Sequence, residues 1–250
     1  MKIKGILVLL VLIVLSSCRS VVAPEFDLNP VVKSEKSENL SYIDIKDESE
    51  LIVKVKVEDK LSLDNSFVSS KRSFYALRTV TVLEVFKQTG KDDQEPIKEE
   101  DLVKAEDQLV IKEAAAIDNL NIYYTSNHMP LAENNEYVLF LKKVNDRYEV
   151  VDGDNGVVDI NNIINNQNTE TTVNVIFEYF KPTINNIALE YVPLKVTKLP
   201  SNVKFERFTV KTDKVDIPVR IGQDTTTQKE YITIGNIYLE LESPILNKIK

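Results

Sequence analysis

Apolar and polar positions alternate along much of the chain from residue 51 onward. Residues 51–57 read Leu-Ile-Val-Lys-Val-Lys-Val, with apolar side chains on one face and mainly lysine on the other. This alternation is typical of a half-buried strand. Residues 74–87 form a longer run of β-branched and aromatic residues, which favours a second strand. We expect these two strands to pair antiparallel across a polar loop, residues 59–73.

Three further short apolar runs follow before residue 160. They cover residues 108–112, 137–142 and 147–151, and Asn145-Asp146 marks a tight turn between the last two. Five strands with this spacing predict a small, highly curved barrel.

The second half of the chain is also rich in strand-like segments. The stretch 161–172 has almost no apolar residue after Ile164 and indicates a boundary or a long loop. Beyond it, strands are expected at 173–180, 188–199, 203–210, 215–221 and 231–240. No amphipathic helix longer than a turn or two is expected, so the pattern predicts an all-β chain.

The N-terminus has the order of a secretory signal. Two lysines precede an apolar run, residues 5–15, and two serines follow it. The run is shorter than the roughly 20 residues that span a membrane. The tetrapeptide Leu15-Ser16-Ser17-Cys18 resembles the lipobox of bacterial lipoprotein precursors.

This resemblance implies that residues 1–17 are removed as a signal peptide and that Cys18 receives a diacylglycerol. Two acyl chains suffice for stable anchoring. We therefore expect lipid attachment at Cys18 and a location on the extracytoplasmic face of the cell membrane or outer membrane. A plain secretory signal and an uncleaved anchor are the alternatives.

Residues 18–48 are rich in Ser, Lys, Glu, Asp and Pro and show no sustained periodicity. Such a segment cannot bury enough apolar surface to order itself, which predicts a lipidated flexible tether. The alternative is that residues 42–45 begin the first strand.

Residues 50–160 resemble the netrin-type module shared with tissue inhibitors of metalloproteinases. The resemblance lies in the order Val-Lys-Val-Lys-Val, Tyr-Ala-Leu-Arg-Thr-Val-Thr-Val-Leu-Glu-Val-Phe-Lys, Leu-Val-Ile-Lys and Asn-Glu-Tyr-Val-Leu-Phe-Leu-Lys-Lys. It implies an OB-like five-stranded β-barrel domain over residues 49–164, followed by a β-rich C-terminal region or domain over 165–250, and a binding role. Those inhibitors use a free N-terminal cysteine amine and several disulfides, so none of their site residues transfers.

Charge and cysteine content exclude several classes of function. Removal of residues 1–17 leaves 29 basic against 39 acidic residues, a formal charge of −10. Such a chain would repel a phosphate backbone, so we expect no nucleic-acid partner. With Cys18 as the one cysteine, the chain has no intrachain disulfide and no thiolate zinc site.

Candidate catalytic and metal-binding groups are few. His128, the one histidine, lies in a loop-like context and is expected to be solvated; a hydrolase would have to use it. Asp152-Gly153-Asp154-Asn155-Gly156 fits a turn better than a weak calcium site at Asp152 and Asp154, because the EF-hand spacing fails. The acidic run 99–101 is expected to be a solvated face. We therefore predict no catalytic, cofactor or metal residues and no enzyme activity.

Tyr123 and Tyr124, between the third and fourth expected strands, are candidate partner contacts, because tyrosines are enriched at interfaces. The alternative is that one or both fill the core. The sequence thus predicts a lipid-anchored extracytoplasmic binding or envelope protein whose partner is a protein or an envelope polymer. A passive structural lipoprotein is the main rival.

Overall fold

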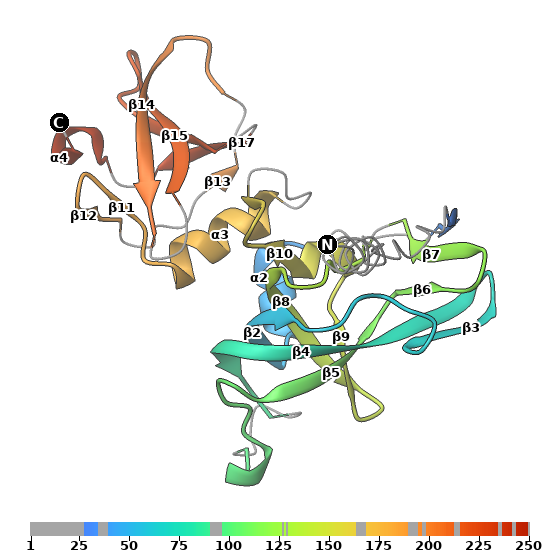
Figure 1. Ribbon diagram of the computed structural model, residues 1–250. Coiled ribbons are helices and arrows are strands. Elements are labelled where there is room, and N and C mark those ends of the chain that lie inside the picture. Colours follow the sequence, from blue (N-terminus) through green and yellow to red (C-terminus); the bar gives the residue numbers. More distant parts are fainter. Residues whose placement is uncertain are drawn as a thin grey trace, which may run out of the picture.

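Strands dominate the computed structural model, in which a barrel and a C-terminal sheet lie on either side of a central helix (Figure 1). The structure describes residues 28–34, 40–90, 97–126, 128, 130–163, 169–189, 195–196, 199–212, 216–234, 237–241 and 244–249. Residues 1–17 and Cys18 lie outside this part of the chain.

The first unit is a closed ring of five strands. They are β2 (Leu51–Val57), β4 (Ser73–Gln88), β5 (Gln108–Glu113), β8 (Glu136–Val144) and β9 (Arg147–Val150). β2 pairs with β4 and β8, β4 pairs with β5, and β8 pairs with β9, all antiparallel, while β5 and β9 pair in parallel and close the ring. The predicted all-β, OB-like barrel is confirmed, with each of the five strands at its expected position.

Apolar residues at alternate strand positions fill the barrel, because every second side chain on a strand points to the same face. The inward residues at its centre are fully buried: Val53, Val55, Val80, Val82, Ile111, Leu139 and Leu141. Asn145 and Asp146 both have positive φ, 48° and 62°, as a tight hairpin turn requires.

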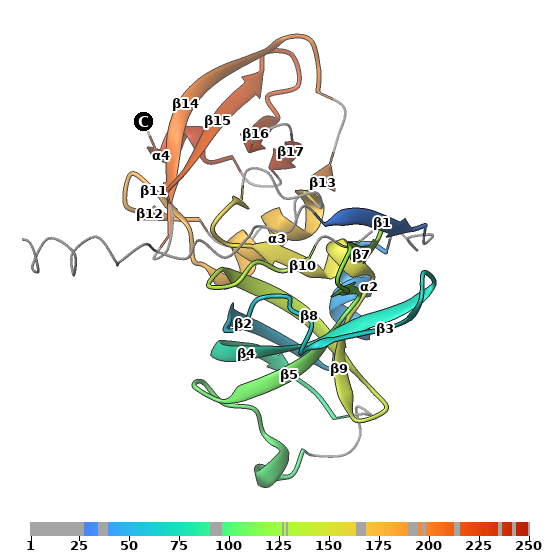
Figure 2. The same ribbon diagram turned by 45° about the vertical axis from the view of Figure 1, so that its right-hand side comes forward.

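Shorter elements extend the barrel. They are β3 (Ser66–Ser70), the 3₁₀ helix η1 (Glu99–Asp101), β6 (Ala115–Ile117), β7 (Asn121–Thr125), the 3₁₀ helix η2 (Gly153–Gly156) and β10 (Val157–Asp159). β3 pairs with β4, so the expected loop 59–73 contains a strand. β6 and β7 form a hairpin (Figure 1), and β10 pairs with β8 on the side of the barrel nearer the C-terminal sheet (Figure 2).

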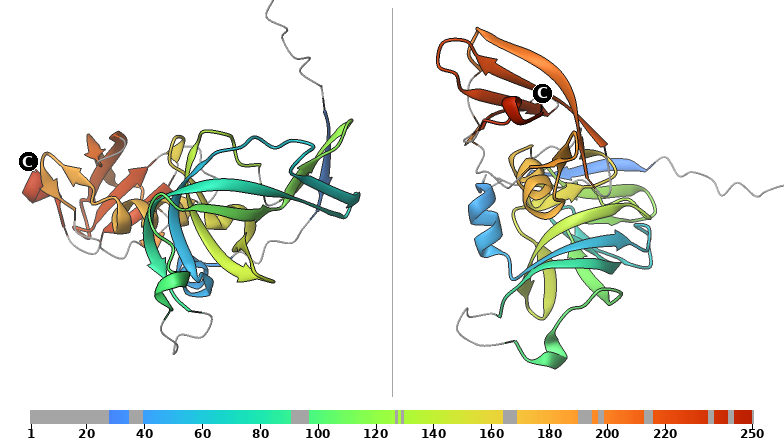
Figure 3. Two further views of the ribbon diagram at one scale, coloured as in Figure 1. Left: turned by 60° about the horizontal axis from the view of Figure 1, so that its bottom comes forward. Right: turned by 90° about the vertical axis from the view of Figure 1, so that its left-hand side faces the viewer.

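Two elements lie within residues 18–48, so the prediction of an unstructured tether is wrong there. β1 (Asn29–Lys33) pairs in parallel with β7, which supplies backbone partners that local sequence could not reveal (Figure 3). α2 (Tyr42–Glu48) begins at Ser41, whose hydroxyl accepts from the Asp44 amide at 3.3 Å. The alternative strand at 42–45 is therefore wrong as well. Residues 18–27 and 35–39 lie outside the described chain.

The central helix α3 (Thr169–Tyr179) replaces an expected strand at 173–180. Its β-branched composition favoured a strand, but the segment is buried from two sides. Val175 packs with the outer face of the barrel and with α2, whereas Ile176 and Phe177 belong to the core of the C-terminal sheet. A helix can present apolar residues in two directions at once, and tertiary burial here overrides local propensity.

The C-terminal unit is one seven-stranded sheet in the order β12-β11-β14-β15-β16-β17-β13. Its elements are β11 (Thr183–Ile184), β12 (Ile187–Ala188), β13 (Lys195–Val196), β14 (Val203–Lys211), β15 (Asp216–Asp224), β16 (Glu230–Ile234), β17 (Ile237–Leu241) and α4 (Leu246–Ile249). The strands expected at 203–210 and 215–221 are present. The one expected at 231–240 is two strands, and the one at 188–199 is reduced to β12 and β13 in the described residues.

The core of this unit lies between one face of the sheet and the helices α3 and α4. Among the described residues, no helix has the length and apolar character needed to cross a membrane.

Candidate functional site

Charged side chains occupy inward positions at one end of the barrel. β4 points Ala76, Arg78, Val80 and Val82 inward, so Arg78 stands where the pattern calls for an apolar residue. Arg78 and Glu113 are both fully buried, and Arg78 Nη1 donates to Glu113 Oε2 at 2.5 Å. Arg78 also donates from Nε to Asp59 Oδ1 at 3.1 Å and from Nη2 to the Asp59 carbonyl.

Glu113 is the centre of this buried cluster. Besides Arg78, its carboxylate accepts from the Leu131 amide at 2.5 Å and lies 3.2 Å from His128 Nε2. Burial by itself raises the pKa of Glu113, but the hydrogen bond with His128 and the attraction of His128 and Arg78 outweigh it, so the pKa is lowered. The site therefore holds a carboxylate inside the barrel.

His128 lies inside the protein rather than in solvent, so the expectation of a solvated loop histidine is wrong. Only 2% of it is exposed. Its Nε2 faces Glu113, and its Nδ1 lies 3.5 Å from Asp154 Oδ1. The ring thus links the loop after β7 to η2, and both of its nitrogens lie next to carboxylates.

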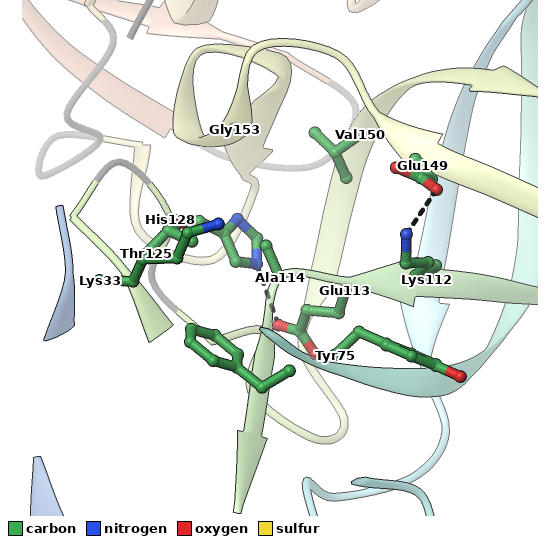
Figure 4. Close-up of a pocket in the computed structure, with 11 residues that line it drawn as sticks. Lys33, Tyr75, Lys112, Glu113, Ala114, Thr125, His128, Glu149, Val150 and Gly153 are labelled. Carbon is green, nitrogen blue, oxygen red and sulfur yellow. Dashed lines mark hydrogen bonds and ion pairs between the residues drawn. The ribbon is translucent and has the colours of Figure 1, made fainter. Parts of the chain in front are cut away.

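A cavity of about 280 Å³ opens beside this cluster (Figure 4). It is close to the lower end of the volumes found for small-molecule sites. Its walls come from β1, β4, β5, β7, β9 and η2 and combine charged, aromatic and apolar groups. The lining residues are Lys33, Phe74, Tyr75, Lys112, Glu113, Ala114, Thr125, His128, Glu149, Val150 and Gly153.

Two of the cavity walls carry specific polar groups. Lys112 on β5 pairs with Glu149 on β9 at 2.8 Å, and its ammonium lies 5.4 Å from the centre of the Tyr75 ring. On the other side, the Thr125 hydroxyl is buried and has no hydrogen-bond partner among the described residues. Buried polar groups in native proteins are nearly always satisfied, so an unpaired hydroxyl in a cavity wall points to a missing partner such as a ligand or water.

The candidate contacts Tyr123 and Tyr124 lie on β7, next to this cavity. Tyr123 is only 5% exposed, and its hydroxyl donates to Asp118 at 2.5 Å. This hydrogen bond, together with the Leu120 and Asn121 amides, lowers the pKa of Asp118 to about 2. Tyr124 is half-buried, pairs with Ala115 and retains some exposed surface. A partner contact by either tyrosine stays a prediction.

The loop at 152–156 is a turn followed by η2. Asp152 and Gly153 adopt left-handed backbone conformations with φ of 50° and 57°. Asp152 Oδ2 accepts from the Leu40 amide at 3.1 Å and from Asn155 Nδ2 at 2.7 Å. Across the described part of the chain, no group of three or more His, Asp or Glu side chains is arranged to hold a metal ion. The acidic run 99–101 forms η1, is exposed and lies outside the cavity lining.

Comparison of the chain with protein-family models, with curated proteins and with solved structures finds no match.

Proposed function

We propose that this chain is a lipid-anchored extracytoplasmic protein that binds a small polar ligand in the cavity at the end of its barrel. The observation that carries the binding role is the buried Thr125 hydroxyl, which has no hydrogen-bond partner among the residues that the structure describes and lies in a cavity wall with charged and aromatic groups. Concave sites with a few placed polar groups are the usual form of small-molecule sites.

The anchor rests on the lipobox-like segment that ends at Cys18. Nine residues lie between Cys18 and Leu28, and the ten residue steps correspond to a reach of at most about 33–36 Å for an extended chain. The chain then enters β1, whose last residue, Lys33, lines the cavity. The segment that would tether the protein thus leads directly to the proposed binding site.

The lining favours a ligand with both hydrogen-bond donors and acceptors. Lys33 and Lys112 offer ammonium groups, Glu113 and Glu149 offer carboxylates, and Thr125 offers a hydroxyl that can donate or accept. A purely apolar ligand would leave the buried Thr125 hydroxyl without a partner among the described residues, at a cost.

The site fits a binding role better than a hydrolytic one. A histidine that acts as a general base needs a free nitrogen near the proton it removes. Here Nε2 lies against Glu113 and Nδ1 against Asp154, so the ring serves as a structural link. We therefore propose no enzyme activity and no cofactor.

Mass spectrometry of captured molecules tests the binding role. The mature chain from residue 19 is incubated with a small-molecule extract of the envelope, desalted and denatured, and the released compounds are identified. Thr125→Val removes the hydroxyl at nearly constant volume, and Ala114→Phe obstructs the cavity. Ala132→Phe places the same bulk at an exposed alanine and is the matched control.

We expect a compound that is retained by wild type and Ala132→Phe and lost from both cavity variants. Retention by all four proteins would show that the compound binds outside the cavity. Retention by none would favour a passive envelope protein.

Palmitate labelling tests the anchor separately. Wild type should incorporate label and sediment with membranes, whereas Cys18→Ala should do neither. Label that persists in Cys18→Ala would show that the lipid is attached elsewhere.

A further inference from the structure

Two arginines lie side by side on the outer face of the C-terminal sheet. Arg207 on β14 and Arg220 on β15 are directly paired across the strands, and both are exposed. Their side chains point away from the core, because the alternate residues Phe208, Val219 and Ile221 pack into it. Directly opposed residues on antiparallel strands have Cβ atoms about 4.5–5.5 Å apart, so the two long side chains start close together and can extend to a shared anion.

Neither arginine is neutralised by a neighbouring carboxylate. Within the described chain, neither one forms an ion pair, and Arg207 has no hydrogen bond from its side chain. The adjacent positions on the same face are Phe205, Thr209, Pro218, Gly222 and Thr233. The nearest acidic residue along β15 on this face, Asp216, is four residues from Arg220, or about 13 Å.

This pairing is unfavourable for the fold alone. Like charges placed directly opposite each other destabilise a sheet. In the described part of the chain, no acidic residue is paired with either arginine across β14, β15 or β16. An arrangement that costs stability and stays exposed is better explained by a ligand of opposite charge than by the fold.

Arg220 is also held in position. Its guanidinium lies 5.5 Å from the centre of the Phe205 ring, and its Nε donates to Thr233 Oγ1 at 3.3 Å. The Phe205 ring lies against Gly222, where an added Cβ would be 2.8 Å from the ring. The glycine therefore allows the ring, and through it the arginine, to lie close to the sheet. A preorganised guanidinium loses less entropy when it binds.

We propose that Arg207 and Arg220 together bind a phosphate group of a soluble phosphate ester. A phosphate has enough oxygens to accept hydrogen bonds from two planar guanidinium groups. A carboxylate is already satisfied by one guanidinium group in bidentate fashion. A soluble ester is favoured over a membrane surface, because the pair is isolated and membrane attraction depends on clusters of basic residues. This site is separate from the barrel cavity and does not depend on it.

Calorimetric titration of the mature chain from residue 19 tests this proposal, with glycerol phosphate as the probe. Arg207→Gln and Arg220→Gln should each weaken binding by about tenfold or more, because charge-assisted hydrogen bonds are among the strongest. Arg207→Lys keeps the charge but loses the planar guanidinium group. Its affinity for glycerol phosphate should therefore lie between those of wild type and Arg207→Gln. Arg72→Gln, at an exposed arginine in the turn before β4, is the charge-matched control and should bind as wild type does.

Three results would overturn the proposal. They are the absence of glycerol phosphate binding by wild type, equal loss in Arg72→Gln, and binding only to phosphatidylglycerol vesicles. Far-ultraviolet circular dichroism of each variant establishes that a loss of binding is not a loss of fold.

Discussion

The buried carboxylate of Glu113 offers the sharpest test of how this barrel is held together. Glu113→Gln keeps the size of the side chain but removes its charge and replaces one acceptor oxygen with a donor. The carboxylate accepts from Arg78 Nη1 and from the Leu131 amide, both at 2.5 Å, on different oxygens. An amide must therefore present its NH₂ group to one of these donors, and the Arg78 charge loses its fully buried partner.

The expected loss follows from this geometry. Removing one partner of a buried ion pair costs about 3–5 kcal/mol. Arg78 keeps its ion pair with the partly exposed Asp59, so the lower end of that range is expected. That is a large part of the roughly 5–15 kcal/mol by which a domain is stable. Urea unfolding followed by circular dichroism measures the loss, and hydrogen exchange in β4 and β5 assigns it to the barrel.

Glu149→Gln is the matched control on the neighbouring strand. Glu149 also pairs with a basic residue, Lys112, but their side chains are 29% and 35% exposed. An exposed pair contributes about 0–1 kcal/mol, so the same chemical change should have little effect here. Equal losses in the two variants would refute the claim that the buried cluster stabilises the barrel.

The acid side of the stability curve provides a second readout. The pKa of Glu113 is lowered in the folded protein from its ordinary value of 4.5. A lowered pKa stabilises the fold above pH 4.5, and that contribution is lost as the pH falls toward the lower folded value. Glu113→Gln should therefore flatten the fall of stability below pH 4.5, whereas Glu149→Gln should leave its shape unchanged.

Three other substitutions have defined outcomes. Gly222→Ala should destabilise the C-terminal sheet by about 1–3 kcal/mol in urea unfolding, because the new Cβ would lie 2.6 Å from the Lys204 carbonyl oxygen; an unchanged midpoint would contradict this. Ser41→Ala should cost about 1 kcal/mol through loss of the α2 cap, and full rescue by Ser41→Asp is expected. Tyr124→Ala should reduce cross-linked capture of a partner by the mature chain if this tyrosine is a contact, while equal capture would remove it from the candidate surface.

The barrel was predictable because its strands carry their own pattern. In β2, inward valines alternate with outward lysines, and Asn145-Asp146 marks the hairpin by its turn chemistry. β1 was not predictable, because its backbone partners come from β7, about 90 residues away. The sequence predicts a strand where α3 lies, because β-branched residues favour strands locally, whereas the burial of this segment on two sides is a tertiary property.

The site was only partly visible in the sequence. The position of Arg78 on the inward face of β4 follows from the alternation and signals a buried charge. Its partner Glu113, the last residue of β5, is also a buried charged residue at an inward position. The position of His128 depends on how the loop after β7 folds over the end of the barrel, and no local pattern encodes that path. The cavity itself depends on six separate elements and could not be deduced from any one of them.

Nuclear magnetic resonance of the His128 ring tests ligand binding in the cavity most directly. Because this is the one histidine of the chain, its ring gives a single set of signals from the cavity wall. Fractions of envelope extract are added to the mature chain and to Ala114→Phe. The proposed function predicts a fraction that shifts the His128 signals of wild type in a saturable manner and leaves those of Ala114→Phe unchanged. If every fraction leaves the wild-type signals in place while the protein stays folded, or shifts both proteins equally, the cavity is not the binding site.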